Sequence, residues 1–155
     1  MSKGHPDTLI SLQSIGDAYY RLGRFEEASN VCMEVYEARK YTLGANHPDT
    51  LRSLQSIGDA YYRLGRFEEA LHVFQNVYEA RKYTLGAVHP DTLYSLQSVG
   101  TAYSSLGWYE NALRVFQEVY EVRKQVLGET HADTLAALTA INTHKQILAK
   151  LNKPN

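Results

Sequence analysis

Hydrophobic residues recur along the chain with the spacing of one face of an α-helix. The first stripe, at three- and four-residue steps, is Leu9, Leu12, Ile15, Tyr19 and Leu22. A wider stripe follows at Ala28, Val31, Cys32, Val35 and Tyr36. This spacing is typical of amphipathic helices, whereas strands alternate apolar and polar residues, a pattern that no segment shows. The sequence therefore predicts an all-α fold made of helical pairs.

The two stripes repeat every 42 residues. The sequence His-Pro-Asp-Thr-Leu begins at His5, His47 and His89, and a variant with Ala for Pro begins at His131. The first and second units agree at 35 of 42 positions, and the second and third at 27. A fixed period of this length is typical of solenoids, in which each unit buries its apolar faces against the next. We expect a single domain over 1–155 with repeats 5–46, 47–88 and 89–130 and a half-repeat cap over 131–152.

Local signals place the helix ends in each unit. Pro6 and Asp7 suit a first helical turn, and Gly23 suits a left-handed cap that ends the first helix. The second helix should extend to about Leu43.

A glycine in the middle of the first helix indicates how the two helices of a unit pack. Glycine costs about 1 kcal/mol relative to alanine in a helix interior, so its recurrence at Gly16, Gly58 and Gly100 needs a reason. We expect a close approach of the paired helices at this position. The expected small partners are Ala28, Ala70 and Ala112.

The two ends of the array differ. In the half repeat, Asn142 and Lys145 replace the Gly and Tyr of complete units, while Leu135, Leu138, Ile141 and Leu148 keep the inward stripe. The half repeat is therefore predicted to be a C-terminal solvating cap. No such cap precedes His5, so we expect apolar surface at the N-terminal end.

Several recurring positions resemble the tetratricopeptide-repeat pattern. They are Leu12, Ile15, Gly16, Tyr19, Gly23, Ala28 and the aromatic slot at Cys32, Phe74 and Phe116. The repeat length, the His-Pro-Asp-Thr opening and the Arg-Lys…Leu-Gly exit resemble the longer variant of kinesin light chains. The resemblance implies a right-handed superhelical solenoid of three hairpins and a capping helix, whose first helices line a concave groove for an extended peptide. It implies a non-enzymatic protein–protein interaction module.

The first helices supply the candidate peptide-binding residues. These are Gln13, Asp17, Tyr20 and Arg21 in the first unit, Arg52, Gln55, Asp59, Tyr62 and Arg63 in the second, and Tyr94 and Gln97 in the third. The glutamines are predicted to clamp a peptide main chain, because carboxamides both donate and accept hydrogen bonds. The Asp and Arg of units one and two are four residues apart and should pair. Agreement between nearly identical units is expected from duplication alone, so it says little about binding.

Composition excludes several functional classes. The chain has 16 basic and 17 acidic residues, which argues against binding to nucleic acid or an anionic membrane. No apolar run approaches the ~18 residues of a membrane span. The single cysteine cannot form an internal disulfide, and the N-terminus has no apolar leader, so we expect a cytoplasmic protein.

No residue pattern points to catalysis, a metal or a cofactor. The four histidines that open the units are a helix-packing distance or more apart, too far to share one zinc ion. They should cap helices or lie at the surface. Cys32 is expected to be a buried, inert thiol, and Trp108 a half-exposed residue at a turn. The rival interpretation is a structural spacer, or a segment engineered or excised from a longer repeat protein, which self-associates head to tail through its uncapped N-terminal end.

Overall fold

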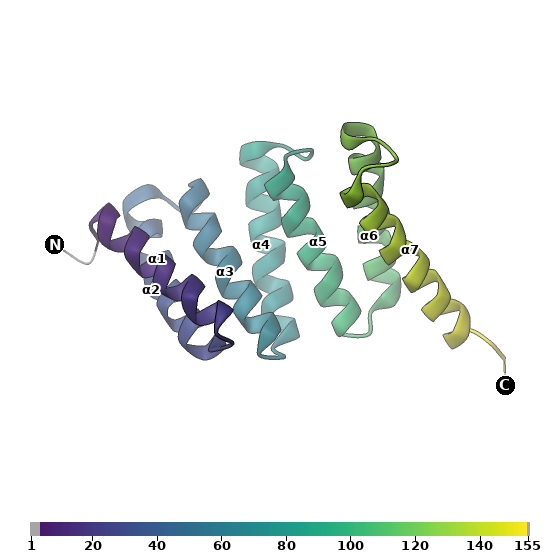
Figure 1. The fold of residues 1–155 in the computed structure, drawn as a ribbon, viewed down its shortest axis with the longest axis horizontal. Coiled ribbons are helices and arrows are strands. Elements are labelled where there is room, and N and C mark those ends of the chain that lie inside the picture. The colour runs from purple at the N-terminus through teal and green to yellow at the C-terminus, as the bar shows by residue number, and fades with distance from the viewer. Residues whose placement is uncertain (1–3, 155) are drawn as a thin grey trace.

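The computed structural model describes residues 4–154, which contain helices and no strands, and the all-α prediction is confirmed (Figure 1). The helices are α1 (Pro6–Arg21), α2 (Phe25–Leu43), α3 (Pro48–Arg63), α4 (Phe67–Leu85), α5 (Pro90–Ser105), α6 (Tyr109–Leu127) and α7 (Ala132–Leu151). Residues 1–3, on which the prediction of no leader partly falls, and residue 155 lie outside the described residues. None of the helices in the described part combines the length and the hydropathy that a membrane span requires.

Each helix packs against the helices before and after it in sequence. Helices α1, α3, α5 and α7 form one layer, and α2, α4 and α6 form the layer behind it (Figure 1). Each predicted 42-residue unit contains one helical hairpin, and α7 forms the half repeat. The chain is therefore an all-α repeat solenoid, as expected.

Histidine caps begin the helices of the front layer. The Nδ1 atom of His5 accepts a hydrogen bond from the Asp7 backbone N–H at 3.2 Å, and His47, His89 and His131 do the same at 3.1 Å. The predicted capping role is confirmed. The predicted left-handed glycine is also present, with φ near +78° at Gly23, and α2 ends at Leu43.

The paired helices approach closely at the mid-helix glycine, as predicted. A Cβ atom on Gly58 would lie 2.6 Å from Cε1 of Phe74, and one on Gly16 would lie 2.8 Å from Sγ of Cys32. The predicted Ala28 does lie next to Gly16, with its carbonyl oxygen 3.8 Å from such a Cβ atom, but the nearest side chain at Gly16, Gly58 and Gly100 comes from one helical turn later, at the Cys/Phe slot.

Both ends of the solenoid expose apolar side chains. Ile15 is 47% exposed while its equivalent Ile57 is 1% exposed, since α2 packs against α3 but no described helix covers this face of α1. The predicted apolar N-terminal surface is confirmed. At the other end Asn142 and Lys145 are exposed, as expected of a cap. Leu135, expected to point inward, is 47% exposed because no helix of the described residues covers this face of α7.

Candidate peptide-binding groove

Two neighbouring cavities open on the layer formed by α1, α3 and α5. The first, of about 210 Å³, is lined by Gly16, Asp17, Tyr20, Arg21, Ala28, Cys32, Ser56 and Asp59. The second, of about 230 Å³, is lined by Tyr20, Asp59, Tyr62, Arg63, Phe74, Tyr94, Gln97, Ser98 and Thr101. Most lining residues of the second lie 42 positions after those of the first, so the cavities are repeat equivalents. We call these two cavities the groove.

The first cavity reaches a deeper floor than the second. Gly16 and Ala28 line it, whereas their equivalents Gly58 and Ala70 do not line the second cavity. The reason is the substitution at the aromatic slot. The ring of Phe74 covers Gly58, while the smaller Cys32 leaves the floor of the first cavity open.

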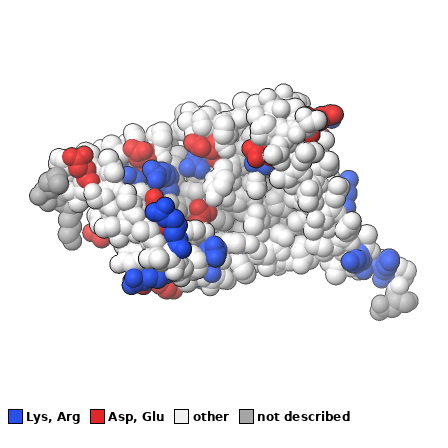
Figure 2. All heavy atoms as spheres, in the orientation of Figure 1, with Lys and Arg blue, Asp and Glu red and all other residues white. Residues whose placement is uncertain are grey.

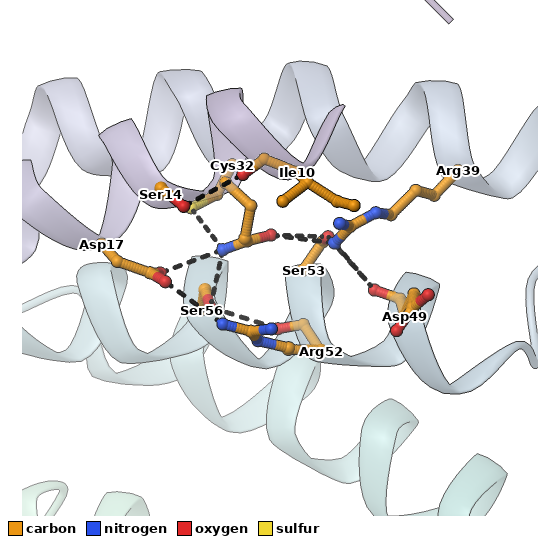
Figure 3. Close-up of polar contacts among 10 residues, drawn as sticks. Ile10, Ser14, Asp17, Cys32, Arg39, Asp49, Arg52, Ser53 and Ser56 are labelled. Atoms are coloured by element: carbon orange, nitrogen blue, oxygen red, sulfur yellow. Dashed lines mark hydrogen bonds and ion pairs between the residues drawn. The ribbon is translucent and has the colours of Figure 1, made fainter. Parts of the chain in front are cut away.

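Gln13 does not line the groove and is buried between the first two repeats, 2% exposed. Its Oε1 atom accepts hydrogen bonds from Nη1 of Arg39 at 3.1 Å and from Oγ of Ser53 at 2.9 Å. Its Nε2 atom donates to Oδ1 of Asp17 at 3.0 Å and to Oγ of Ser56 at 3.5 Å. Figure 3 shows these partners arranged around the amide. We call this arrangement, with its equivalents in later repeats, the junction network.

The junction network recurs between the second and third repeats. Gln55 is 4% exposed, accepts from Ser95 at 3.0 Å and donates to Asp59 at 3.2 Å. Arg81, also buried, donates to Oγ of Ser95 at 2.8 Å.

Between the third repeat and the cap, Gln97 is half-buried and accepts from Arg123 at 2.8 Å. The position of Ser53 and Ser95 is Ala137 there, so the third junction lacks the hydroxyl that completes the other two.

The predicted clamping of a peptide by Gln13 and Gln55 is therefore wrong. The next repeat covers both side chains, and their amide atoms already bond to residues of the chain. A usable signal was present in the sequence, because Arg39 and Ser53 recur as Arg81 and Ser95 with the same period as the glutamines. Buried polar groups require such partners.

The groove aspartates do not pair with the arginine four residues later, contrary to the prediction. Asp17 forms its ion pair with Arg52 of the next repeat at 3.3 Å. The Tyr94 hydroxyl faces the Asp59 carboxyl and lowers its pKa, and Tyr94 is the repeat equivalent of Arg52. Each aspartate is thus held by the same position of the following repeat, one helix along the groove.

The two arginines at the groove edge are differently placed. The guanidinium of Arg63 lies 4.6 Å from the ring centroid of Phe25 and 5.8 Å from that of Tyr20. This stacking links the second repeat to the first. Arg21 is exposed and lines the first cavity, and no hydrogen bond or ion pair joins it to another residue of the described range.

Burial perturbs two ionisable groups in the groove. Burial raises the pKa of Asp59 to about 6, against hydrogen bonds from Gln55 and Tyr94 and the positive charge of Arg81, which lower it. Burial and the neighbouring Asp59 raise the pKa of Tyr94 to about 12. The Tyr94 hydroxyl therefore remains a donor at physiological pH, and the Asp59 carboxyl changes charge in mildly acidic solution.

Charge is unevenly distributed along the front layer. Figure 2 shows blue and red side chains over the part that contains α1 and α3, whereas the middle of the part with α5 and α7 is mostly uncharged. The third unit has Thr101, Ser104 and Ser105 where the second has Asp59, Tyr62 and Arg63. The groove is thus charged toward the N-terminus and uncharged toward the C-terminus.

The structure also shows where the possible metal ligands, Cys32 and Trp108 lie. Within residues 4–154, no three His, Cys, Asp or Glu side chains come close enough together to hold a metal ion. Cys32 is 2% exposed, and burial raises the pKa of its thiol to about 11. Trp108 is 49% exposed at the start of α6, as predicted, and its ring lies near that of Tyr103.

His144, to which no sequence pattern assigned a role, is buried in the structure. Its Nε2 atom lies 2.8 Å from Oγ of Ser104, and its ring packs beside Phe116 at 5.1 Å between centroids. His144 occupies the slot of the small Ala102, so the cap fills this space with an imidazole instead of a methyl group.

Family models of the tetratricopeptide repeat match residues 7–82 and 92–133. Two crystal structures of kinesin light chain-like, nearly identical TPR-like repeats from Podosopora anserina superpose with TM-scores of 0.85 and 0.84 at 25% identity, covering 97% of this chain and 71% of theirs. BtubC from P. vanneervenii superposes with a TM-score of 0.73 at 15% identity, covering 97% and 68%. No curated protein matches the sequence significantly.

Proposed function

The chain belongs to the tetratricopeptide-repeat family, whose repeats generally mediate protein–protein interactions, and on this premise we propose that its groove binds an extended peptide segment of a partner protein. The main support is the pair of repeat-equivalent cavities on one face. The two cavities lie one repeat apart along the front layer, so an extended peptide that crosses this layer would pass over both of them. Such a peptide can place one side chain in each cavity.

The predicted residues divide into contact and positioning groups. Tyr20, Arg21, Tyr62, Arg63 and Tyr94 line the cavities and would contact the peptide. Asp17 and Asp59 also line them, and they orient Arg52 and Tyr94 respectively. Gln97 is half-buried at the second cavity and remains a candidate contact. Gln13 and Gln55 would act only indirectly, by holding successive repeats at a fixed angle.

The distribution of charge sets the expected ligand. Arg21 lines the first cavity and has no ion pair within the described residues, whereas Asp17 is paired with Arg52, so this part favours a peptide segment with an acidic side chain. The part over α5 suits small polar side chains. Binding would involve no chemical step and no cofactor, consistent with a family that is typically non-catalytic. A cytoplasmic setting suits the single buried thiol of Cys32.

Selection of a random-peptide display library against the protein, followed by anisotropy titration of a selected peptide, tests the proposal. Arg21→Glu should raise Kd at least tenfold, because this exposed guanidinium lines the first cavity. The matched control is Arg114→Glu, which makes the same charge change at an exposed position of α6 in the rear layer and should change Kd less than twofold. Equal effects of the two variants, or amide shifts confined to α2, α4 and α6, would contradict groove binding.

A further inference from the structure

The outer face of α1 carries apolar side chains that inner repeats bury. Ile15 is 47% exposed and Leu22 71% exposed. Their equivalents are Val99 of α5, which is 4% exposed, and Leu106, the residue directly after α5, which is half-buried. We call the set Asp7, Ser11, Ile15, Ala18 and Leu22 the docking face.

The structure shows what covers the equivalent face of α5. Leu71, Phe74 and Tyr78 of α4 pack in one cluster with Val99 and Ala102 of α5 and with Leu106 at its C-terminal end. The three α4 residues occupy positions i, i+3 and i+7 of one helical stripe. An apolar stripe with this spacing therefore fits the docking face, whose residues correspond to those of α5 one by one.

The docking face also presents the acceptors for an arginine. Three residues after Tyr78, Arg81 donates to the Asp91 carbonyl at 3.3 Å and to Oγ of Ser95 at 2.8 Å. Arg39 donates in the same way to the Asp49 carbonyl and to Ser53. On α1, Ser11 donates to the Asp7 carbonyl at 3.0 Å, as Ser53 does to Asp49 and Ser95 to Asp91 at 3.2 Å. The acceptor pair that receives an arginine in two inner junctions is thus repeated at the N-terminal end.

We propose that the docking face binds an amphipathic α-helix of a partner protein, with apolar residues at i, i+3 and i+7 and an arginine at i+10. The spacing and the acceptors together identify this chemistry, because the full combination covers α5 within the chain. On α2, which packs against α3, the arginine is also present, and Ser29 stands at the first of the three apolar positions.

A second copy of this chain does not offer such a helix. Helices α2, α4 and α6 are each packed between two neighbours of their own chain. The open face of α7 presents Leu135, Thr139, Asn142 and Gln146, which lack both the apolar stripe and the arginine. The occupant is therefore not a second copy of this chain, and its site is separate from the groove.

A synthetic peptide with the sequence of α4, the helix that covers α5 within the chain, tests the proposal. The probe is a fluorescent peptide with the sequence of residues 66–86, stapled between positions 72 and 76 on the side away from the docking stripe. Circular dichroism first establishes that the peptide is helical. Anisotropy titration against the whole protein should then give saturable binding.

Four variants locate the binding. Ile15→Asp should weaken binding at least tenfold, and Arg81→Ala in the peptide at least fivefold. Ile10→Asp is the matched control, because Ile10 is also exposed on α1 but lies outside the docking face, and it should change Kd less than twofold. Both substituted residues are already exposed, and circular dichroism checks that the variants remain folded. Arg21→Glu, in the groove, should have no effect on this peptide.

Three results would overturn the proposal. One is the absence of saturable binding by a peptide that is helical. Another is binding that Ile15→Asp does not weaken. The third is self-association of the unliganded protein, seen by sedimentation velocity, that Ile15→Asp abolishes, since a second copy would then occupy the face.

Discussion

Replacing Gln13 by methionine measures what the junction network contributes. Methionine is similar in size and flexibility, so the change removes polar contacts and leaves little cavity. It deletes the acceptor of Arg39 and Ser53 and the donor to Asp17 and Ser56. A buried hydrogen bond to a charged group contributes roughly 1.5–3 kcal/mol. Arg39 keeps the Asp49 carbonyl and Ser53 as acceptors, so we expect a total loss of about 2–3 kcal/mol.

Gln97→Met is the matched control at the third junction. Gln97 is half-buried, and its amide accepts from Arg123, which also retains the Asp133 carbonyl as an acceptor. The expected loss there is about 1 kcal/mol or less. For a domain of this size, 1 kcal/mol corresponds to roughly 2–4 °C in Tm. Thermal and urea unfolding followed at 222 nm should therefore separate the variants by several degrees. An equal Tm for the two, or an unchanged Tm for Gln13→Met, would refute a structural role for the buried glutamine.

Three further predictions follow from the packing and the ionisable groups. Gly58→Ala should lower the free energy of unfolding by about 1–3 kcal/mol, because the new Cβ atom would lie 2.6 Å from Phe74. The control Arg66→Ala removes an exposed ion pair with Glu69 and should shift Tm little, so similar Tm values for the two variants would contradict the close approach. The pKa of Asp59 in the folded protein, about 6, exceeds its ordinary value of 3.8, so stability present below pH 4 should be lost as the pH rises through 6. Asp59→Asn should remove this slope in urea titrations, and Asp17→Asn should retain it; a slope that survives in Asp59→Asn would show that another group causes it. Burial raises the pKa of the Cys32 thiol to about 11, so its reaction with a disulfide reagent near pH 8 should be at least tenfold slower in the folded protein than in concentrated urea, and equal rates would show an accessible thiol.

The helices and their ends were predictable because local chemistry determines them. The caps at His5 and Gly23 and the stop after Leu43 depend on residues within a few positions of one another. The exposed Ile15 was also predictable, since a repeat at the end of an array lacks one neighbour. The approach at Gly58 was predicted, but its partner Phe74 was not, because helical periodicity gives the face of a helix and not the side chain that reaches across it.

The site was less predictable than the fold because a polar residue on a helix can either face solvent or be buried against the next repeat. Gln13 and Asp17 lie one turn apart, and both could have faced solvent by periodicity alone. The structure buries Gln13 and leaves Asp17 at the groove, because the following repeat packs over the first position only. That distinction depends on the angle between repeats, which no local pattern contains. Pairing of Asp17 with Arg52 instead of Arg21 has the same origin, since the next helix brings a closer cation.

Differences between repeats consequently carry more information about recognition than their agreement does. The agreeing residues Gln13 and Gln55 hold the repeats together, and duplication preserves them whether or not a ligand binds. By contrast, one position of the front layer differs in each repeat: it is Ile10 in the first, Arg52 in the second and Tyr94 in the third. Arg52 pairs with Asp17, and Tyr94 faces Asp59. The Cys/Phe slot likewise decides which of two equivalent cavities has the deeper floor. A groove assembled from one repeated unit would present the same surface at every step, so a preferred register for a peptide depends on these few departures from the repeat.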